Sequence, residues 1–138
     1  VRTDLVVVAF GTNEASSRRA LGATYAHEVD EAIATIRAHA GTTVPVVLLG
    51  GTYFKDLRRQ RAVDEALESA ANSHRDTAFW SMSNLITESG GWGTWRAAGW
   101  AQSDQVHLAR RGYARLAEGL TEALMAPGTS GWVSDARR

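Results

Sequence analysis

The chain contains no cysteine among its 138 residues and has no excess of charge of either sign. Without cysteine it can form neither a disulfide nor a thiolate metal site, and its redox compartment is left open. Its 15 basic and 15 acidic residues give a net charge of zero. The chain therefore lacks the basic surplus with which proteins neutralise phosphates, and no nucleic-acid partner is expected.

No apolar run approaches the roughly 18–20 residues that a membrane helix needs, so we expect no membrane span and a soluble protein. The four histidines show neither the H-x-x-x-H nor the H-E-x-x-H spacing, so we expect no metal and no cofactor. What is present is a 44% hydrophobic composition, enough for the core of one domain. The chain starts at Val1 and enters a strand within a few residues, which favours a piece of a longer protein.

Three apolar segments predict β-strands, at residues 4–10, 44–49 and 77–82. The first two are near-continuous runs, a pattern typical of parallel strands covered on both faces. Apolar residues at helical spacing follow each strand. The helices expected from this spacing cover residues 17–40, 56–71 and 109–125. The segment 83–103, rich in glycine and tryptophan, is expected to be irregular.

This alternation predicts an α/β fold, a three-layer parallel sheet with helices on both faces, as in flavodoxin-like proteins. Residues 1–127 are assigned to this domain and residues 128–138 to a loosely held tail. On the second helix, residues 58–61 (Arg-Arg-Gln-Arg) are interpreted as a solvated face. Its predicted core positions are Leu57, Val63, Ala66, Leu67 and Ala70.

Asp104 and His107 stand three residues apart on a short turn before the last helix. A carboxylate so placed can accept the imidazole Nδ1–H and leave Nε2 free to take a proton from a nucleophile. Asn13 directly follows the first strand, and ligands of such folds bind at the carboxyl ends of the strands. Taken singly, Asn13 also fits an ordinary turn residue and His107 a structural partner of Asp104. Together they favour a catalytic site at one edge of the sheet.

Two stretches carry a family resemblance. Residues 4–15, DLVVVAFGTNEA, resemble the third sequence block of the SGNH (GDSL-type) hydrolases, in which a strand ends in Gly-x-Asn. Residues 103–120, SDQVHLARRGYARLAEGL, resemble their last block, Asp-x-x-His before a helix. The Phe79-Trp80 strand and the loop 90–93 resemble the branch that acts on O-acetylated peptidoglycan and other carbohydrates.

The resemblance implies a role for each matched residue. His107 would be the general base that activates a serine, and Asp104 would orient it. Asn13 would donate its side-chain amide to the developing oxyanion. Three further residues, in loops that would approach the substrate, are Gly11, Gly91 and Trp92. The resemblance also favours a periplasmic or extracellular location.

The family's Gly-Asp-Ser block, which supplies the nucleophile, occurs nowhere in this chain, and we find no counterpart of the second block. In the family's strand order, 2-1-3-4-5, the strand at 4–10 would be the third and would lie beside an absent first strand. It would then be a long apolar edge, which native proteins avoid because such edges aggregate. We therefore expect an upstream segment, a second chain or a swapped copy to complete the sheet.

The sequence thus favours the C-terminal part of a serine ester hydrolase acting on small acyl groups, with an acetylated glycan as the substrate that the resemblance implies. Acyl transfer to a sugar would use the same residues. The alternative is a non-catalytic α/β module that binds a carbohydrate or a protein, and a third interpretation is an inert fragment. The tryptophans of the segment 83–103, which either line a sugar cleft or pack the loop, are Trp92, Trp95 and Trp100.

Overall fold

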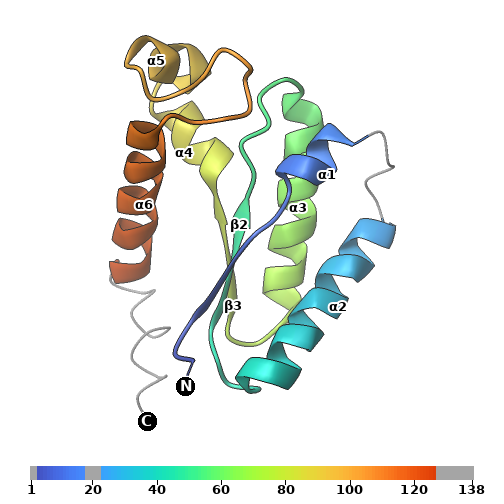
Figure 1. The fold of residues 1–138 in the computed structure, drawn as a ribbon. Coiled ribbons are helices and arrows are strands. Elements are labelled where there is room, and N and C mark those ends of the chain that lie inside the picture. Colours follow the sequence, from blue (N-terminus) through green and yellow to red (C-terminus); the bar gives the residue numbers. More distant parts are fainter. Residues whose placement is uncertain (1–2, 18–22, 127–138) are drawn as a thin grey trace.

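The computed structural model describes residues 3–17 and 23–126, so the tail expected at 128–138 lies outside the described residues, as does part of the first expected helix. Its strands are β1 (Val6–Ala9), β2 (Val46–Gly50) and β3 (Thr77–Ser81). They form one parallel sheet in the order β1-β2-β3 (Figure 1). The three strand predictions are thus confirmed, with bounds that differ by one or two residues at each changed end.

Six helices surround this sheet in the described part of the chain. They are α1 (Thr12–Ser16), α2 (Ala23–Ala40), α3 (Leu57–Ser73), α4 (Met82–Glu88), α5 (Gly91–Ala97) and α6 (Arg110–Met125). α2 and α3 cover one face of the sheet, and α6 lies on the other (Figure 1). Helices on both faces of a parallel sheet confirm the predicted α/β architecture.

The prediction that residues 83–103 are irregular is wrong, because α4 and α5 occupy most of this segment. The Ser81 hydroxyl caps α4 by accepting the backbone N–H of Asn84 at 3.1 Å. Trp92 and Trp95 of α5 are 8% and 0% exposed, in a second core cluster under the N-terminal half of α6. Glycine disfavours a helix locally, but burial of two indole rings outweighs that preference.

Two predictions about α3 are also wrong. Leu57, expected in the core, is 40% exposed, whereas Gln60, expected in solvent, is completely buried. The Asp56 side chain caps the helix by accepting the N–H groups of Arg58 and Arg59, and this sets where the first turn begins. From that start, Gln60 shares the inward face with Val63, three residues further on.

β1 is covered on one face only, so its predicted burial on both faces is wrong. Val6 and Val8 pack against the core, whereas Val7 points away from it and is 46% exposed. β2 fits the prediction, since Val46, Val47 and Leu48 are at most 1% exposed. Within the described residues, β1 is one of the two edge strands, and nothing pairs with its outer side.

Substituting Gly112 with alanine is expected to destabilise the fold. A Cβ there would lie 2.1 Å from the Trp100 carbonyl oxygen, a backbone atom that cannot move aside as a flexible side chain would. Overpacking of this kind costs about 1–3 kcal/mol, to be measured by urea unfolding. Gly93→Ala is the matched control, since a Cβ there meets nothing within 4 Å. Equal urea midpoints for Gly112→Ala and Gly93→Ala would contradict the close contact between α6 and the Trp100 backbone.

Candidate active site

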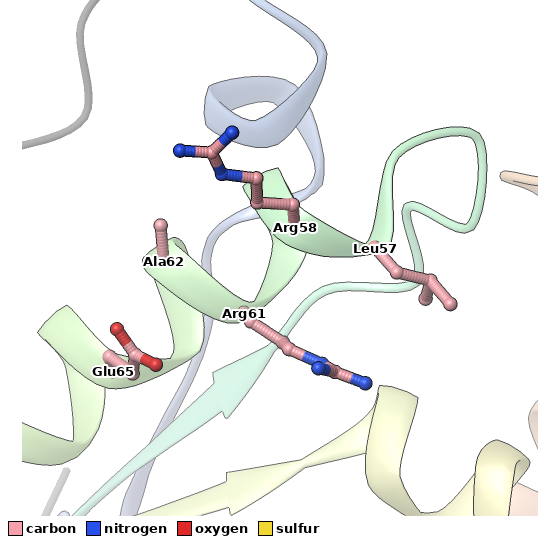
Figure 2. A pocket seen from close by; sticks show the side chains of 5 residues that line it. All are labelled: Leu57, Arg58, Arg61, Ala62 and Glu65. Atoms are coloured by element: carbon pink, nitrogen blue, oxygen red, sulfur yellow. The ribbon is translucent and has the colours of Figure 1, made fainter.

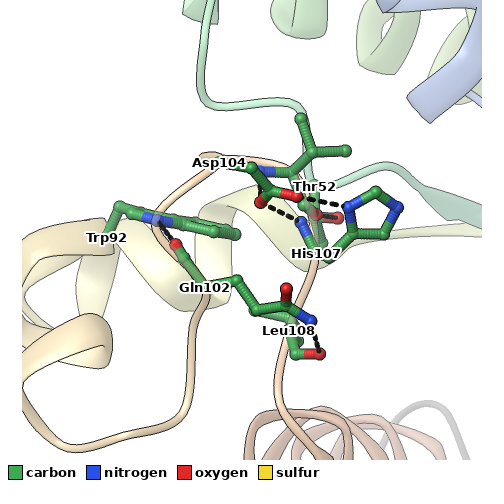
Figure 3. A network of polar contacts seen from close by, with 7 residues as sticks. Thr52, Trp92, Gln102, Asp104, His107 and Leu108 are labelled. Carbon is green, nitrogen blue, oxygen red and sulfur yellow. Dashed lines mark hydrogen bonds and ion pairs between the residues drawn. The ribbon is translucent and has the colours of Figure 1, made fainter.

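Asp104 and His107 form a closed turn at the carboxyl edge of the sheet (Figure 3). Oδ2 of Asp104 lies 2.6 Å from Nδ1 of His107. Oδ1 accepts two backbone N–H groups, from Val106 at 3.0 Å and from His107 at 2.9 Å. These partners are only two and three residues apart, and the Thr52 hydroxyl and the Phe54 N–H add contacts from outside the turn, to the Val106 and Gln105 carbonyls.

These hydrogen bonds favour the ionised form of Asp104. The His107 side chain first, and then the backbone N–H groups of His107 and Val106, hold the pKa of Asp104 well below its ordinary value. An ionised carboxylate only accepts hydrogen bonds, so in the neutral imidazole Nδ1 carries the proton and Nε2 is the acceptor. Nε2 makes no hydrogen bond to any described residue, and the His107 side chain is 64% exposed. The imidazole is therefore oriented to accept a proton from outside the turn.

The segment from Gly11 to Asn13 forms a second corner at the end of β1. Gly11 has a φ of 108° and no room for a side chain, since a Cβ would lie 2.6 Å from Cγ1 of Val63. Its N–H donates to the Glu14 carboxylate at 2.9 Å, a contact that the sequence interpretation missed. Asn13 is exposed in α1, and its side-chain amide makes no hydrogen bond within the described part of the chain.

Thr52, at the end of β2, joins the two corners and was not predicted as a site residue. Its N–H donates to the Thr12 hydroxyl at 3.2 Å, and its own hydroxyl donates to the Val106 carbonyl at 2.8 Å. The segments that carry Asn13 and His107 therefore lie at the same edge of the sheet, although about ninety residues separate them in sequence.

Trp92 bonds to the segment that leads into the Asp104–His107 turn (Figure 3). Its indole N–H donates to the Gln102 carbonyl at 2.9 Å, and its ring lies 4.9 Å from that of Phe54. Trp92 and Trp95 are both buried, so packing is the interpretation that these two rings support. Gly91, with a φ of 80°, begins α5 beside Trp92. Substrate contact by this loop stays a prediction.

A buried polar cluster lies beneath the site. Asp64 is 8% exposed and accepts hydrogen bonds from the Gln60 amide at 2.8 Å and from the hydroxyls of Ser81 and Ser83 at 2.7 and 2.9 Å. Burial raises the pKa of Asp64, against the lowering effect of these bonds. The sequence analysis did not predict this cluster, and the signal that could have indicated it is the spacing of four residues between Gln60 and Asp64 on the apolar face of the helix.

A groove of about 410 Å³ runs along the outer face of α3 (Figure 2). Its lining residues are Leu57, Arg58, Arg61, Ala62 and Glu65. None of the predicted site residues lines it, so the groove is separate from the Asp104–His107 turn. Across residues 3–17 and 23–126, no three acidic or histidine side chains gather as metal ligands would. Within the same ranges, no helix has the length and apolar content of a membrane span.

Residues 1–115 match the family model of the GDSL-like lipase/acylhydrolase family. The matched range contains the Gly11–Asn13 corner and the Asp104–His107 turn. Neither a curated protein nor a solved structure matches the chain significantly. A family model that covers most of the chain, together with the observed sheet, confirms the resemblance at the level of the family. The chain belongs to the GDSL-like lipase/acylhydrolase family.

Proposed function

We propose that this chain is the C-terminal part of a serine ester hydrolase, with His107 as general base, Asp104 as its orienting carboxylate and Asn13 as an oxyanion donor. The observation that carries this proposal is the 2.6 Å contact between Nδ1 of His107 and Oδ2 of Asp104, in an exposed imidazole whose Nε2 bonds to no described residue. Such a pair supplies the base and its orienting group in serine acyl transfer.

In the proposed reaction, a serine hydroxyl attacks the ester carbonyl carbon while its proton passes to Nε2 of His107. The Asn13 amide stabilises the negative charge that develops on the carbonyl oxygen. His107 then gives the proton to the departing alcohol, which leaves an acyl-serine. Water, deprotonated by the same Nε2, releases the acid and frees the serine.

The proposed substrates are small acyl esters, with acetyl groups on a carbohydrate first among them. The substrate class rests on the resemblance of the Phe79-Trp80 strand and the 90–93 loop to carbohydrate O-acetylesterases. The exposure of His107, 64% of its side chain, is compatible with an acyl group carried on a bulky glycan. Acetate release from O-acetylated glycans, compared with that from simple acetyl esters, tests this class.

The nucleophilic serine is proposed to come from an upstream segment or from a second chain that pairs with β1. The N–H groups of Val6 and Phe10 donate to the carbonyls of Pro45, directly before β2, and Leu49 of β2, so by alternation those of Val7 and Ala9 face the open edge. A parallel strand there would pair these groups and cover Val7. Its carboxyl end would lie beside Gly11, where a serine following that strand would be close to Asn13.

The direct test combines the intact mass of every species in the purified sample with an assay of p-nitrophenyl acetate hydrolysis. We expect activity only where a second, serine-bearing polypeptide or segment is present. A single 14.9 kDa species that hydrolyses the ester would contradict the missing-nucleophile proposal. A complemented sample without hydrolysis would contradict the enzyme proposal and leave a carbohydrate- or protein-binding module.

Asn13→Ala is expected to lower kcat in an active, complemented sample by roughly 10²–10³-fold, the usual effect of removing one oxyanion donor. KM should change little, because the oxyanion forms only on the way to the transition state. Asn72→Ala, at an exposed position of α3, is the matched control and should leave kcat unchanged. An unaltered kcat in Asn13→Ala, measured by steady-state kinetics, would remove Asn13 from the oxyanion site.

A further inference from the structure

Thr52 connects the two halves of the candidate site through both of its polar groups. It is 6% exposed, so these groups have little access to water. Its N–H bonds to the hydroxyl of Thr12, the residue before Asn13, at 3.2 Å. Its hydroxyl bonds to the Val106 carbonyl, directly before His107, at 2.8 Å. One residue thus contacts the neighbour of each proposed functional side chain.

The contact with Val106 fixes the peptide group that carries His107 (Figure 3). The oxygen of this peptide accepts from the Thr52 hydroxyl, and its N–H, which belongs to His107, donates to Oδ1 of Asp104 at 2.9 Å. A planar peptide held at both its oxygen and its nitrogen cannot rotate freely. The direction in which the His107 side chain leaves the backbone depends on that plane.

The segment that bears Thr52 is itself anchored. The Tyr53 N–H donates to the side-chain oxygen of the fully buried Gln60 at 3.0 Å, and the Phe54 N–H donates to the Gln105 carbonyl at 2.8 Å. Before it, Gly51 has no room for a side chain, because a Cβ would lie 2.6 Å from the Thr12 nitrogen. The backbone around Thr52 is therefore held in place between the Gly11–Asn13 corner and the Asp104–His107 turn.

We infer that Thr52 is a positioning residue, which sets the place of Nε2 of His107 relative to the Asn13 amide. The inference rests on the proposed function for its catalytic meaning, whereas its structural part concerns this chain alone. Small displacements of reacting groups, of the order of 1 Å, can lower a rate by about 10²-fold. Neither Thr52 nor its hydroxyl belongs to the reacting atoms.

The test compares Thr52→Val, which keeps the shape and loses the hydroxyl, with Thr52→Ser, which restores it. Thr35→Val is the matched control, since that hydroxyl bonds to a helix carbonyl at an exposed site of α2. In the chain as it stands, we expect Thr52→Val to speed hydrogen exchange at the His107 and Phe54 amides by about tenfold, because the Val106 carbonyl loses its buried partner. The His107 Nδ1 proton resonance should shift or broaden, and Thr52→Ser should restore both signals.

In a complemented, active sample, Thr52→Val should lower kcat by about tenfold or more with little change in KM. Exchange rates and an Nδ1 resonance that match those of Thr35→Val would overturn the inference, as would an unchanged kcat in an active sample. A third outcome is that Thr52→Val changes the exchange rates and the Nδ1 resonance, but the complemented wild type shows no hydrolysis. That outcome would contradict the proposed enzyme and support the structural role of Thr52. Failure of the Thr52 inference and failure of the proposed enzyme function thus give different results.

Discussion

Replacing His107 with alanine is expected to reduce kcat for ester hydrolysis by roughly 10²–10⁴-fold, the contribution typical of a positioned general base. Without the imidazole, only the Asp104 carboxylate remains of the pair, and a carboxylate is a much weaker base than an imidazole. The fold should persist, since the His107 side chain is 64% exposed. Steady-state kinetics on the serine-complemented sample, with thermal unfolding alongside, measures both effects.

His39→Ala is the control for the loss of a histidine. Nδ1 of His39 lies 2.8 Å from the Thr35 carbonyl at an exposed position of α2, away from the site, so hydrolysis should be unaffected. An active enzyme that keeps its full kcat without His107 would contradict the assignment of the base. It would also leave the Asp104–His107 contact as a purely structural feature of the turn.

Asp64→Val is expected to destabilise the fold by about 3 kcal/mol or more, since each buried donor left without an acceptor costs roughly 1–3 kcal/mol. The Gln60 amide and the hydroxyls of Ser81 and Ser83 all donate to Asp64. The two hydroxyls, 3.0 Å apart, can still bond to one another, which limits the loss. Asp64→Asn keeps an acceptor oxygen and should lose much less. Urea unfolding of both variants gives the comparison.

The difference in free energy of unfolding between the wild type and Asp64→Asn is expected to depend on pH. Burial raises the pKa of Asp64, so the folded protein binds this proton more tightly than the unfolded chain, whose carboxyl titrates near 3.8. Relative to Asp64→Asn, the wild type should therefore be most stable below that pH and should lose free energy of unfolding as pH rises through the raised pKa. A difference between the two proteins that grows in favour of the wild type with rising pH would contradict a raised pKa.

The features that the sequence alone sufficed to predict are local or periodic. The three strands follow from their apolar runs, and the α/β architecture follows from their alternation with helices. The Asp104–His107 contact also follows from the sequence, because side chains three residues apart on a turn lie close enough to bond to each other. The family resemblance is likewise local, since it rests on two short segments, residues 4–15 and 103–120.

Tertiary structure decided the features that depend on distant neighbours. α5 forms despite its glycines because Trp92 and Trp95 find a core to enter, and that core is built partly by α6. Gln60 is buried because the cap at Asp56 and the packing of α3 turn that helix face inward. Thr52 has no sequence signature, since its two partners, Thr12 and Val106, are 40 and 54 residues away. Periodicity reports which side of an element is apolar, whereas only packing shows what each side meets.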